Sequence, residues 1–448
     1  MIRVRISPFA RSSIVLTAFL LSAPVVGHDS RDSGHSRDSQ ESRPQLDPVR
    51  SWNQLALQTV RATSASDAQA ARLYAMVNVA MYDAANGIIP VRDHVIVPPH
   101  DAPRSGDRHA AAAAAAHAVL VGEFPGRQAI YDAQLARDLE ALGPGVATKA
   151  GWQWGAAVGA RVRAARANDG STPNETQPAG AGPGQFRTAW SGVQFRNLLP
   201  FGIADSSPYV GKGPPALDSL DYAAAFAEEK LVGDAANVDP EKLATFQYWR
   251  RGTGTSQPPG AWIQVALAVT SEHPLPLAQM TRLLALVSIA MADTVAPTTE
   301  TKFVYRHWRP ATAIREADTD GNPLTDADPT WVPRAGPNPA DIGTTPEYWS
   351  GHSSFSGAGA AALAGFYCND SISFVLVTDP PGPTGTERTY PSFSAAASEA
   401  GRSRVVGGVH FEFSNHEALA SGRAVAAEIL ANKLLRRVGP THFGQCPT

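Results

Sequence analysis

The stretch Arg72-Leu-Tyr-Ala-Met-Val-Asn-Val-Ala-Met-Tyr-Asp83 returns without a gap as Arg282-Leu-Leu-Ala-Leu-Val-Ser-Ile-Ala-Met-Ala-Asp293. Seven of the twelve aligned positions are identical. In both copies the apolar residues recur every three to four positions, which is the spacing of one face of an α-helix. Either the two stretches arose by duplication, or two alanine-rich amphipathic helices have converged. A duplication predicts two packed helical bundles within one domain.

The same helical spacing continues through most of the chain from residue 47 onward. It predicts helices at 70–85, 109–122, 127–142, 148–167, 218–231, 240–250, 276–297 and 415–437. Two stretches rich in proline and glycine, 171–217 and 317–346, are expected to run as long excursions over the helical body. Residues 371–378 alternate enough to predict one strand of a small β-hairpin. The predicted fold class is therefore all-α, with two packed helical bundles in one domain and a small hairpin.

The N-terminus has the features of a secretory signal peptide over residues 1–27. A start with three arginines precedes a short apolar run and a stretch of small residues. That run is shorter than the ~20 apolar residues of a membrane anchor. Residues 28–46 are polar and repetitive and predict a disordered tail. This division leaves 47–448 as a single helical domain, which is expected to be secreted or periplasmic and to have no membrane span.

The bulk composition excludes some classes of protein. The 448 residues carry a formal net charge of -3, so neutralisation of nucleic acid is not expected. Only two cysteines are present, Cys368 and Cys446. Two isolated cysteines do not make a zinc site, whereas an exported protein could pair them. The spacing does not decide whether they pair, and the oligomeric state, including a homo-oligomer, stays open.

Lys302-Phe-Val-Tyr-Arg-His-Trp-Arg309-Pro310 is the first of three segments with a chemical signature. On a continuous helix, a separation of seven residues is close to two turns, which would place Lys302 and Arg309 on nearly the same face. Two neighbouring cations are best tolerated when an anion lies between them. Pro310 discourages an unperturbed continuation of the helix. The alternative is an ordinary solvated basic face.

Trp349-Ser350-Gly351-His352 is the second segment, and it opens an alanine-rich stretch. A Ser-Gly pair at the start of a helix leaves backbone N–H groups free to bind an anion, and Gly351 lets a ligand approach the backbone closely. His352, at the mouth of such a site, can exchange protons near neutral pH. A serine N-cap with an incidental histidine is the alternative interpretation.

Ser403-Arg404-Val-Val-Gly-Gly-Val-His410 is the third segment. The pair Gly407-Gly408 is expected to end or bend a helix, so that Arg404 and His410 converge on one point. Ser414 and Glu417 have the spacing of a capping box that would start the final helix just after His410. A core or surface histidine is the alternative.

Taken together and in this order, the three segments resemble the signature of the vanadium-dependent haloperoxidases and of the type 2 phosphatidic acid phosphatases. Trp308 and the run Pro-Glu-Tyr-Trp-Ser-Gly-His ending at His352 look more like the haloperoxidase branch. The long helical N-terminal half, which begins near Trp52, also looks more like that branch. The resemblance extends over residues 48 to 440, with the active-site half at about 276–437.

The resemblance implies a role for each matching residue. In the family, a lysine and two arginines bind the oxygens of vanadate or phosphate, and a serine and a glycine N–H complete the cradle. One histidine ligates vanadium, or attacks phosphorus in the phosphatases, and another histidine acts as acid and base. The matching residues in this chain are, in that order, Lys302, Arg309, Arg404, Ser350, Gly351, His410 and His352.

The implied activity is that of an exported vanadate-dependent haloperoxidase, an oxidoreductase with vanadate as its cofactor. Hydrogen peroxide, a halide and a small organic substrate would be its partners. The alternative is an exported acid phosphatase that uses the same pocket without metal, takes a phosphate ester and forms a phosphohistidine at His410. A third interpretation is an oxyanion-binding protein without turnover.

Two positions depart from the family pattern. Ser414 stands four residues after His410, where the family often has an acidic residue that orients the histidine ring. Glu412 or His416 is a candidate replacement. Thr345 stands seven residues before His352, where chlorinating members have an aromatic residue, so the halide preference is left open.

Overall fold

The computed structural model describes residues 47–379 and 386–437, and these are predominantly helical. The predicted signal peptide and tail, at 1–27 and 28–46, lie outside the described residues. The α-helices are α1 (Pro48–Thr63), α2 (Asp67–Ile88), α3 (Arg108–Glu123), α4 (Gln128–Leu142), α5 (Val146–Ala165), α6 (Leu220–Val232), α7 (Pro240–Trp249), α8 (Gln257–Glu272), α9 (Leu277–Asp293), α10 (Val295–Tyr305), α11 (Pro310–Arg315), α12 (Pro339–Ile342), α13 (Gly351–Tyr367), α14 (Phe393–Val406) and α15 (Glu412–Asn432).

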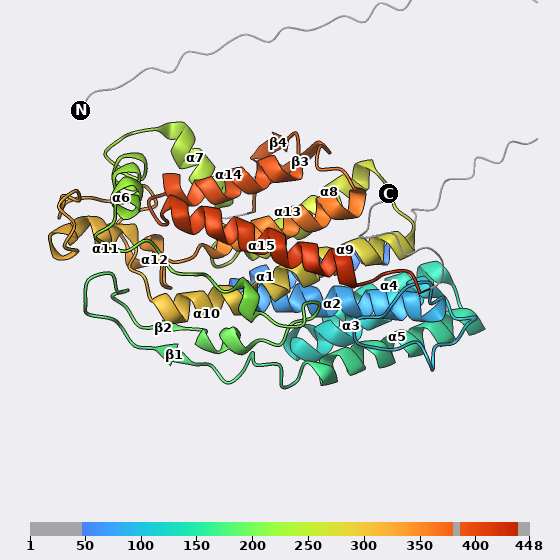
Figure 1. Cartoon of the computed structure of the whole chain (residues 1–448). Coiled ribbons are helices and arrows are strands. Elements are labelled where there is room, and N and C mark those ends of the chain that lie inside the picture. The colour runs from blue at the N-terminus through green and yellow to red at the C-terminus, as the bar shows by residue number, and fades with distance from the viewer. Residues whose placement is uncertain (1–46, 380–385, 438–448) are drawn as a thin grey trace, which may run out of the picture. The chain divides into compact units, whose positions relative to one another are not determined.

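Helices α1 to α5 form a first bundle in which α2 is the central member (Figure 1). Helix α2 begins with a complete capping box, because Ser66 accepts from the backbone N–H of Gln69 and Gln69 returns a bond to the backbone of Ser66. Nearly every residue of α2 from Ala70 onward is buried, since α3 and α5 cover one side and α9 covers the other.

Helices α8, α9, α13, α14 and α15 form a second bundle, and α9 packs against α2 of the first (Figure 1). The two central helices run antiparallel, because Tyr82 near the end of α2 faces Arg282 near the start of α9. One cluster of buried apolar side chains passes through both bundles. The predicted all-α class with two packed bundles is therefore confirmed.

In both bundles the repeated stretch ends with an aspartate that accepts hydrogen bonds from three consecutive backbone N–H groups. Asp83 on α2 accepts hydrogen bonds from the backbone N–H groups of residues 95–97, each at 2.8 Å. Asp293 on α9 accepts from the N–H groups of residues 201–203, at 2.7 to 2.9 Å. Burial raises the pKa of each carboxyl to about 6. A shared function at aligned positions favours duplication over convergence of two alanine-rich helices.

The non-helical stretches follow the prediction in outline. Residues 171–217 contain the short pair β1 (Thr176–Gln177) and β2 (Trp190–Ser191), together with the 3₁₀ turns η2 (Val193–Asn197) and η3 (Ser207–Tyr209). The predicted hairpin is present as β3 (Phe374–Val377) paired antiparallel with β4 (Glu387–Tyr390). Two further 3₁₀ turns are η1 (Pro125–Arg127) and η4 (Ala317–Thr319).

Two helical predictions need correction. The range 276–297 is not one helix, because α9 ends at Asp293 and α10 starts at Val295. The Ser414–Glu417 capping box does not form, because α15 already begins at Glu412 and Ser414 lies buried inside it. Glu417 instead accepts the hydroxyl of Tyr348.

The combined helical run Leu277–Tyr305, 29 residues long, meets the length and composition of a membrane-crossing helix. Its most apolar window is entirely buried inside the protein. The core helix of a soluble protein has the same properties, so this run is weak evidence for a membrane span.

Helices α13 and α15 cross with almost no space between their backbones, and this crossing fixes the two helix starts that carry the candidate site. A Cβ on Gly422 of α15 would lie 2.1 Å from the carbonyl oxygen of Ser354. A Cβ on Gly357 of α13 would lie 2.3 Å from the carbonyl oxygen of Leu419. Because backbone cannot move aside as a flexible side chain can, each position requires glycine.

We expect Gly422→Ala to push the two helices apart and to lower the free energy of unfolding by about 1–3 kcal/mol, the usual cost of overpacking. Urea unfolding followed by circular dichroism measures this change. Gly126→Ala is the matched control, because a Cβ there meets no atom within 4 Å. Equal stability of the two variants would contradict the close crossing.

Candidate functional site

Lys302 lies in the last turn of α10 and is 7% exposed. Its Nζ donates to the carbonyl oxygens of Pro346 and Glu347, the latter at 3.3 Å. Burial lowers the pKa of Lys302, and the charge of Arg309 lowers it further. The amine is therefore held by neutral carbonyls in a position where a second cation disfavours its charge.

Lys302 and Arg309 do not share a helix face, contrary to the sequence expectation. Helix α10 ends at Tyr305, and Arg306 has a left-handed backbone (φ 50°) that turns the chain away. Arg309 is the N-cap residue of α11, with Pro310 at its first position. A proline is favourable there because the first N–H groups of a helix have no intrahelical acceptor. The two cations converge by a turn of the chain and not by helical periodicity.

Arg309 is buried between two loops. Its Nε donates to the carbonyl oxygen of Thr345 at 2.8 Å, and its Nη1 donates to that of Val409 at 2.7 Å. Nη1 also lies 3.0 Å from Nε2 of His410. Burial lowers the pKa of Arg309 to about 10. Gly343 (φ 118°) packs against the guanidinium, where a Cβ would lie 2.5 Å from Cζ.

The start of α13 carries the Ser-Gly-His segment. Ser350 is the N-cap residue, as the alternative interpretation of this segment had it, and its Oγ accepts from the N–H and the hydroxyl of Ser353 at 3.3 and 2.9 Å. Gly351 opens the helix, where the first backbone N–H groups have no intrahelical acceptor. A Cβ on Gly351 would lie 3.4 Å from Oδ2 of Asp67, so the first bundle also reaches this site.

His352 lies beside the cationic groups. Its Nε2 is 2.9 Å from the carbonyl oxygen of Arg250. A carbonyl only accepts, so Nε2 carries the proton and Nδ1 is the nitrogen with a free lone pair. Burial and then the charge of Arg404 hold the pKa of His352 well below its usual range. The ring is therefore neutral until an anion compensates the surrounding charge.

Arg404, in the last turn of α14, has hydrogen-bond donors without acceptors. The side chain is 8% exposed, and neither Nε nor Nη1 has a partner among the described residues. Its Cζ lies 5.0 Å from the ring centroid of Phe246. Burial, followed by the charge of Arg309, lowers its pKa to about 9. Buried donors without partners are rare in proteins, so this guanidinium is suited to bind a ligand with acceptor atoms.

His410 lies between Arg309 and Glu347, directly before α15. Because a guanidinium only donates, the contact with Arg309 makes His410 Nε2 an acceptor. The proton is therefore on Nδ1, which lies 3.0 Å from Oε1 of Glu347. Burial and the surrounding cations keep the pKa of His410 well below its usual range. The Nε2 lone pair is thus available on the side that faces the cations.

Glu347 is the functional candidate that sequence reasoning missed. Its Oε1 also accepts from the N–H of Phe411 at 3.1 Å, and its Oε2 has no partner among the described residues. Ser414 is farther from His410 Nδ1, at 3.5 Å. Glu412 pairs with Arg402 at 2.7 Å, and His416 is exposed, so neither replaces the acid expected after His410. The orienting acid comes instead from the loop before α13.

Asp67 is a second acid near the site that the sequence did not indicate. It begins α2, and burial raises its pKa while the charge of Lys302 lowers it. Among the described residues, no group of three or more His, Cys, Asp or Glu side chains could hold a metal ion. The site's Lys and Arg side chains, with the two histidines beside them, are suited to bind an oxyanion.

The seven predicted residues lie at five helix ends: the end of α10, the starts of α11 and α13, the end of α14 and the start of α15. Contacts through residues 345–347 and the bond to His410 join Lys302, Arg309 and His410. His352 and Arg404 belong to the same cluster, because the charges of Arg404, Arg309 and Lys302 all lower the pKa of His352. The site assignment from sequence stays a prediction, now with a defined geometry.

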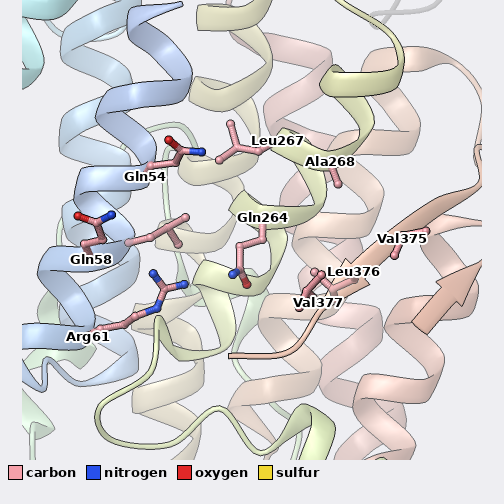
Figure 2. Close-up of a pocket in the computed structure, with 10 residues that line it drawn as sticks. Gln54, Gln58, Arg61, Gln264, Leu267, Ala268, Val375, Leu376 and Val377 are labelled. Atoms are coloured by element: carbon pink, nitrogen blue, oxygen red, sulfur yellow. The ribbon is translucent and has the colours of Figure 1, made fainter. Parts of the chain in front are cut away.

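A separate cavity of about 480 Å³ lies between α1, α8 and β3 and contains none of these residues (Figure 2). Its polar wall consists mainly of Gln54, Gln58 and Gln264. Its only cation, Arg61, is paired with Asp379 at 2.6 Å. The cavity lacks an acid–base group and is a poor candidate for a catalytic site.

Comparisons with known proteins identify relatives of this fold. Residues 282–437 match the family model described as the VCPO second helical-bundle domain. The first bacterial vanadium-dependent iodoperoxidase superposes with a TM-score of 0.73 at 20% identity, over 87% of this chain and 98% of its own. Holo-type bacterial vanadium-dependent chloroperoxidase gives 0.60 at 17% identity, over 83% and 96%. The apo-type chloroperoxidase gives 0.61 at 17%, over 83% and 93%. No curated protein sequence matches.

The fold and the site define an all-α protein with a buried, largely cationic centre built from helix ends. Residues 282–437 match the VCPO second helical-bundle domain by sequence, and the chain as a whole has the fold of the bacterial vanadium haloperoxidases.

We expect Glu347→Gln to remove one pH dependence of stability. Burial raises the pKa of Glu347 to about 7 from 4.5. A raised carboxyl pKa stabilises the folded state fully below about 4.5, and this contribution is lost as the pH rises through 7. The free energy of unfolding of the wild type should therefore fall between pH 5 and 7.5, relative to the variant, by on the order of 1–2 kcal/mol.

Urea titrations at several pH values measure this difference. The matched control is Glu412→Gln, which removes a carboxyl that is paired with Arg402. Parallel pH profiles for wild type and Glu347→Gln would show that Glu347 does not titrate in this range.

Proposed function

We propose that this protein is a vanadate-dependent haloperoxidase that oxidises halide with hydrogen peroxide. The observation that carries the proposal is the guanidinium of Arg404, which is buried with two donor groups that lack acceptors. These donors lie in a cluster with two further cations and with a histidine lone pair. A tetrahedral oxyanion would accept hydrogen bonds from the free N–H groups of Arg404. Its negative charge would also balance the positive charge of the cluster.

The residues present fit vanadate. Lys302, Arg309 and Arg404 would bind its oxygens through charge-assisted hydrogen bonds, for which a guanidinium is geometrically suited. The hydroxyl of Ser350 and the N–H of Gly351 would complete the cradle at the positive end of α13. His410 would be the single protein ligand, through Nε2.

Glu347 and Arg309 prepare His410 for this role. The carboxyl holds the proton at Nδ1 and fixes the plane of the ring, which leaves Nε2 unprotonated. Arg309 occupies Nε2 at 3.0 Å, so an entering oxyanion must take over one of its N–H groups. The exchange is favourable because a charged oxygen is a stronger acceptor than a neutral imidazole.

Held by Lys302, Arg309, Arg404 and His410, vanadate would supply the Lewis acidity needed to make hydrogen peroxide reactive toward halide. His352 is placed to move protons: its Nδ1 has a free lone pair while Nε2 is anchored on Arg250. Its depressed pKa keeps the ring neutral, and therefore able to accept a proton, while the cations are uncompensated. Anion binding reduces that positive potential and makes the proton easier to hold.

We also propose that the protein is exported. The apolar run and basic start of residues 1–27 support a signal peptide. Cys368 is disulfide-bonded, and Cys446, the other cysteine of the chain, lies outside the described residues. Disulfides persist mainly in oxidising compartments.

The activity is tested with purified mature protein, orthovanadate, hydrogen peroxide and iodide, bromide or chloride, by following halogenation of a phenol dye. We expect vanadate-dependent halogenation, with iodide the most easily oxidised halide, and its loss in His410→Ala. Surface His109→Ala is the matched control, because that side chain lies in the first bundle, on α3.

The same samples distinguish the alternative of a phosphatase. Absence of halogenation, together with His410-dependent release of phosphate from an aryl ester in vanadate-free buffer, would replace the proposed function. Binding of vanadate without either reaction would leave an oxyanion-binding protein.

We expect Arg404→Met to separate binding from stability. The change removes donors that a charged oxyanion would accept, so vanadate affinity should fall roughly tenfold to a hundredfold. The free energy of unfolding without vanadate should stay equal or rise, because a buried cation without a counter-charge is removed. Equilibrium dialysis and urea unfolding measure the two effects. Arg402→Met, which breaks exposed ion pairs with Glu228 and Glu412, is the control.

A further inference from the structure

A second cationic pocket lies at the opposite end of α2 from the candidate catalytic site. The cavity has a volume of about 450 Å³ and is formed by the end of α2, the following loop, the start of α9 and the segment after α15. Its cationic lining residues are Arg92, Arg108, Arg436 and Arg437.

Helix α2 separates the two sites. Asp67, at its first position, faces Lys302 and Gly351, whereas Tyr82 and Asn86 near its end line the second pocket. At 1.5 Å per helical residue this separation is about 25 Å. The second pocket is therefore independent of the oxyanion site proposed above.

The arginines of this pocket have no carboxylate partners among the described residues. Arg92 donates from Nη1 to the carbonyl oxygen of Leu434 at 3.1 Å, and Arg108 donates from Nε to that of Ala85 at 3.0 Å. Arg436 and Arg437 are exposed. Backbone carbonyls orient these guanidinium groups but do not neutralise their charge.

The repeated stretch supplies an internal comparison. Arg72 of the first copy pairs with Asp169 at 2.8 Å and with Glu123 at 3.0 Å. Arg282, at the aligned position, is 4% exposed and has no ion pair with a carboxylate among the described residues; its Nε donates to the carbonyl oxygen of Leu434 at 3.4 Å. Burial, followed by the charge of Arg92, lowers its pKa to about 9. Of the two arginines at this aligned position, Arg72 is therefore paired with carboxylates, whereas Arg282 has no such partner among the described residues.

The acids nearest to the pocket are committed elsewhere or exposed. Asp83 directs both oxygens to the N–H groups of residues 95–97. Asp93 is exposed, and its carbonyl oxygen accepts the hydroxyl of Tyr82 at 2.7 Å. The positive charge of the pocket is also seen at His94, whose pKa is lowered by burial and then by Arg437.

The loop that carries Arg92 is held in place. Asn86 donates from Nδ2 to the carbonyl oxygen of Arg92 at 2.9 Å and accepts its N–H at 3.3 Å. The backbone of Arg92 also bridges to Arg436, so both walls of the pocket are tied together. The arginines are therefore presented by a preformed frame.

We propose that this pocket binds the phosphate or sulfate group of an organic anion. Guanidinium groups match such oxyanions in geometry and keep their charge. The start of α9, which contributes Ala278 and Gln279, adds the positive end of a helix. The volume exceeds that of a bare oxyanion, and Pro90, Val91 and Ala278 supply apolar wall for an organic part.

The test uses phenylphosphonate, which a phosphatase cannot hydrolyse, in isothermal titration calorimetry of the full chain at low salt. We expect the double change Arg436→Gln/Arg437→Gln to weaken binding roughly tenfold or more. Both side chains are exposed, so the variant should fold, which thermal melting checks. Arg137→Gln, on exposed α4, should bind as the wild type does. Arg404→Gln removes any contribution from the other oxyanion site.

A second arm asks whether a lipid carries the group, by flotation with vesicles of phosphatidic acid in phosphatidylcholine against phosphatidylcholine alone. Binding that depends on Arg436 and Arg437 in either arm supports the proposal, and the responding arm identifies a soluble or a lipid-borne anion. Binding that persists in the double variant, or that is lost only in Arg404→Gln, overturns it. No binding by the wild type in either arm also overturns it, and this outcome leaves the haloperoxidase proposal untouched.

Discussion

Three buried cations and one buried carboxylate around His410 set the conditions that the rest of this structure must meet. Lys302, Arg309 and Arg404 each disfavour the charge of a neighbour, and His410 lies in direct contact with both Arg309 and Glu347. Such an excess of buried charge costs stability unless it is compensated, because desolvation is large in the protein interior. An oxyanion would compensate the excess positive charge, so the site is arranged to bind an anion.

The packing of helix ends holds this unfavourable arrangement in place. Lys302 is at the end of α10, Ser350 at the start of α13, Arg404 at the end of α14, and His410 directly before α15. Helix starts supply free N–H groups, and the glycine-lined crossing of α13 and α15 fixes their separation. The cations therefore cannot relax apart, and the free energy of packing offsets their repulsion.

Local features of this site could be predicted from the sequence, whereas its tertiary contacts could not. The helix start at the Ser350-Gly351 pair and the helix end at Gly407 depend on neighbouring residues and were predicted correctly. The end of α10 at Arg306 was missed, since the helical spacing of the segment gave no sign of a left-handed residue. Glu347 was missed because its partner is 63 residues away and nothing local marks a buried acid. Helix α8 was not predicted from the sequence, because it is buried on nearly every side and therefore has no amphipathic pattern.

The repeated stretch shows how one local pattern can serve two electrostatic purposes. Asp83 and Asp293 each accept hydrogen bonds from three N–H groups of a crossing segment. The backbone around the two aspartates is therefore held in an equivalent way in both bundles. Arg72 and Arg282 differ, because among the residues that the structure describes carboxylates pair with Arg72 and none pairs with Arg282. An equivalent frame without its counter-charge leaves the buried guanidinium of Arg282 uncompensated, close to the arginines that line the second pocket. The chain therefore concentrates uncompensated positive charge at both ends of its central helix pair, and oxyanion binding is the chemistry that both ends favour.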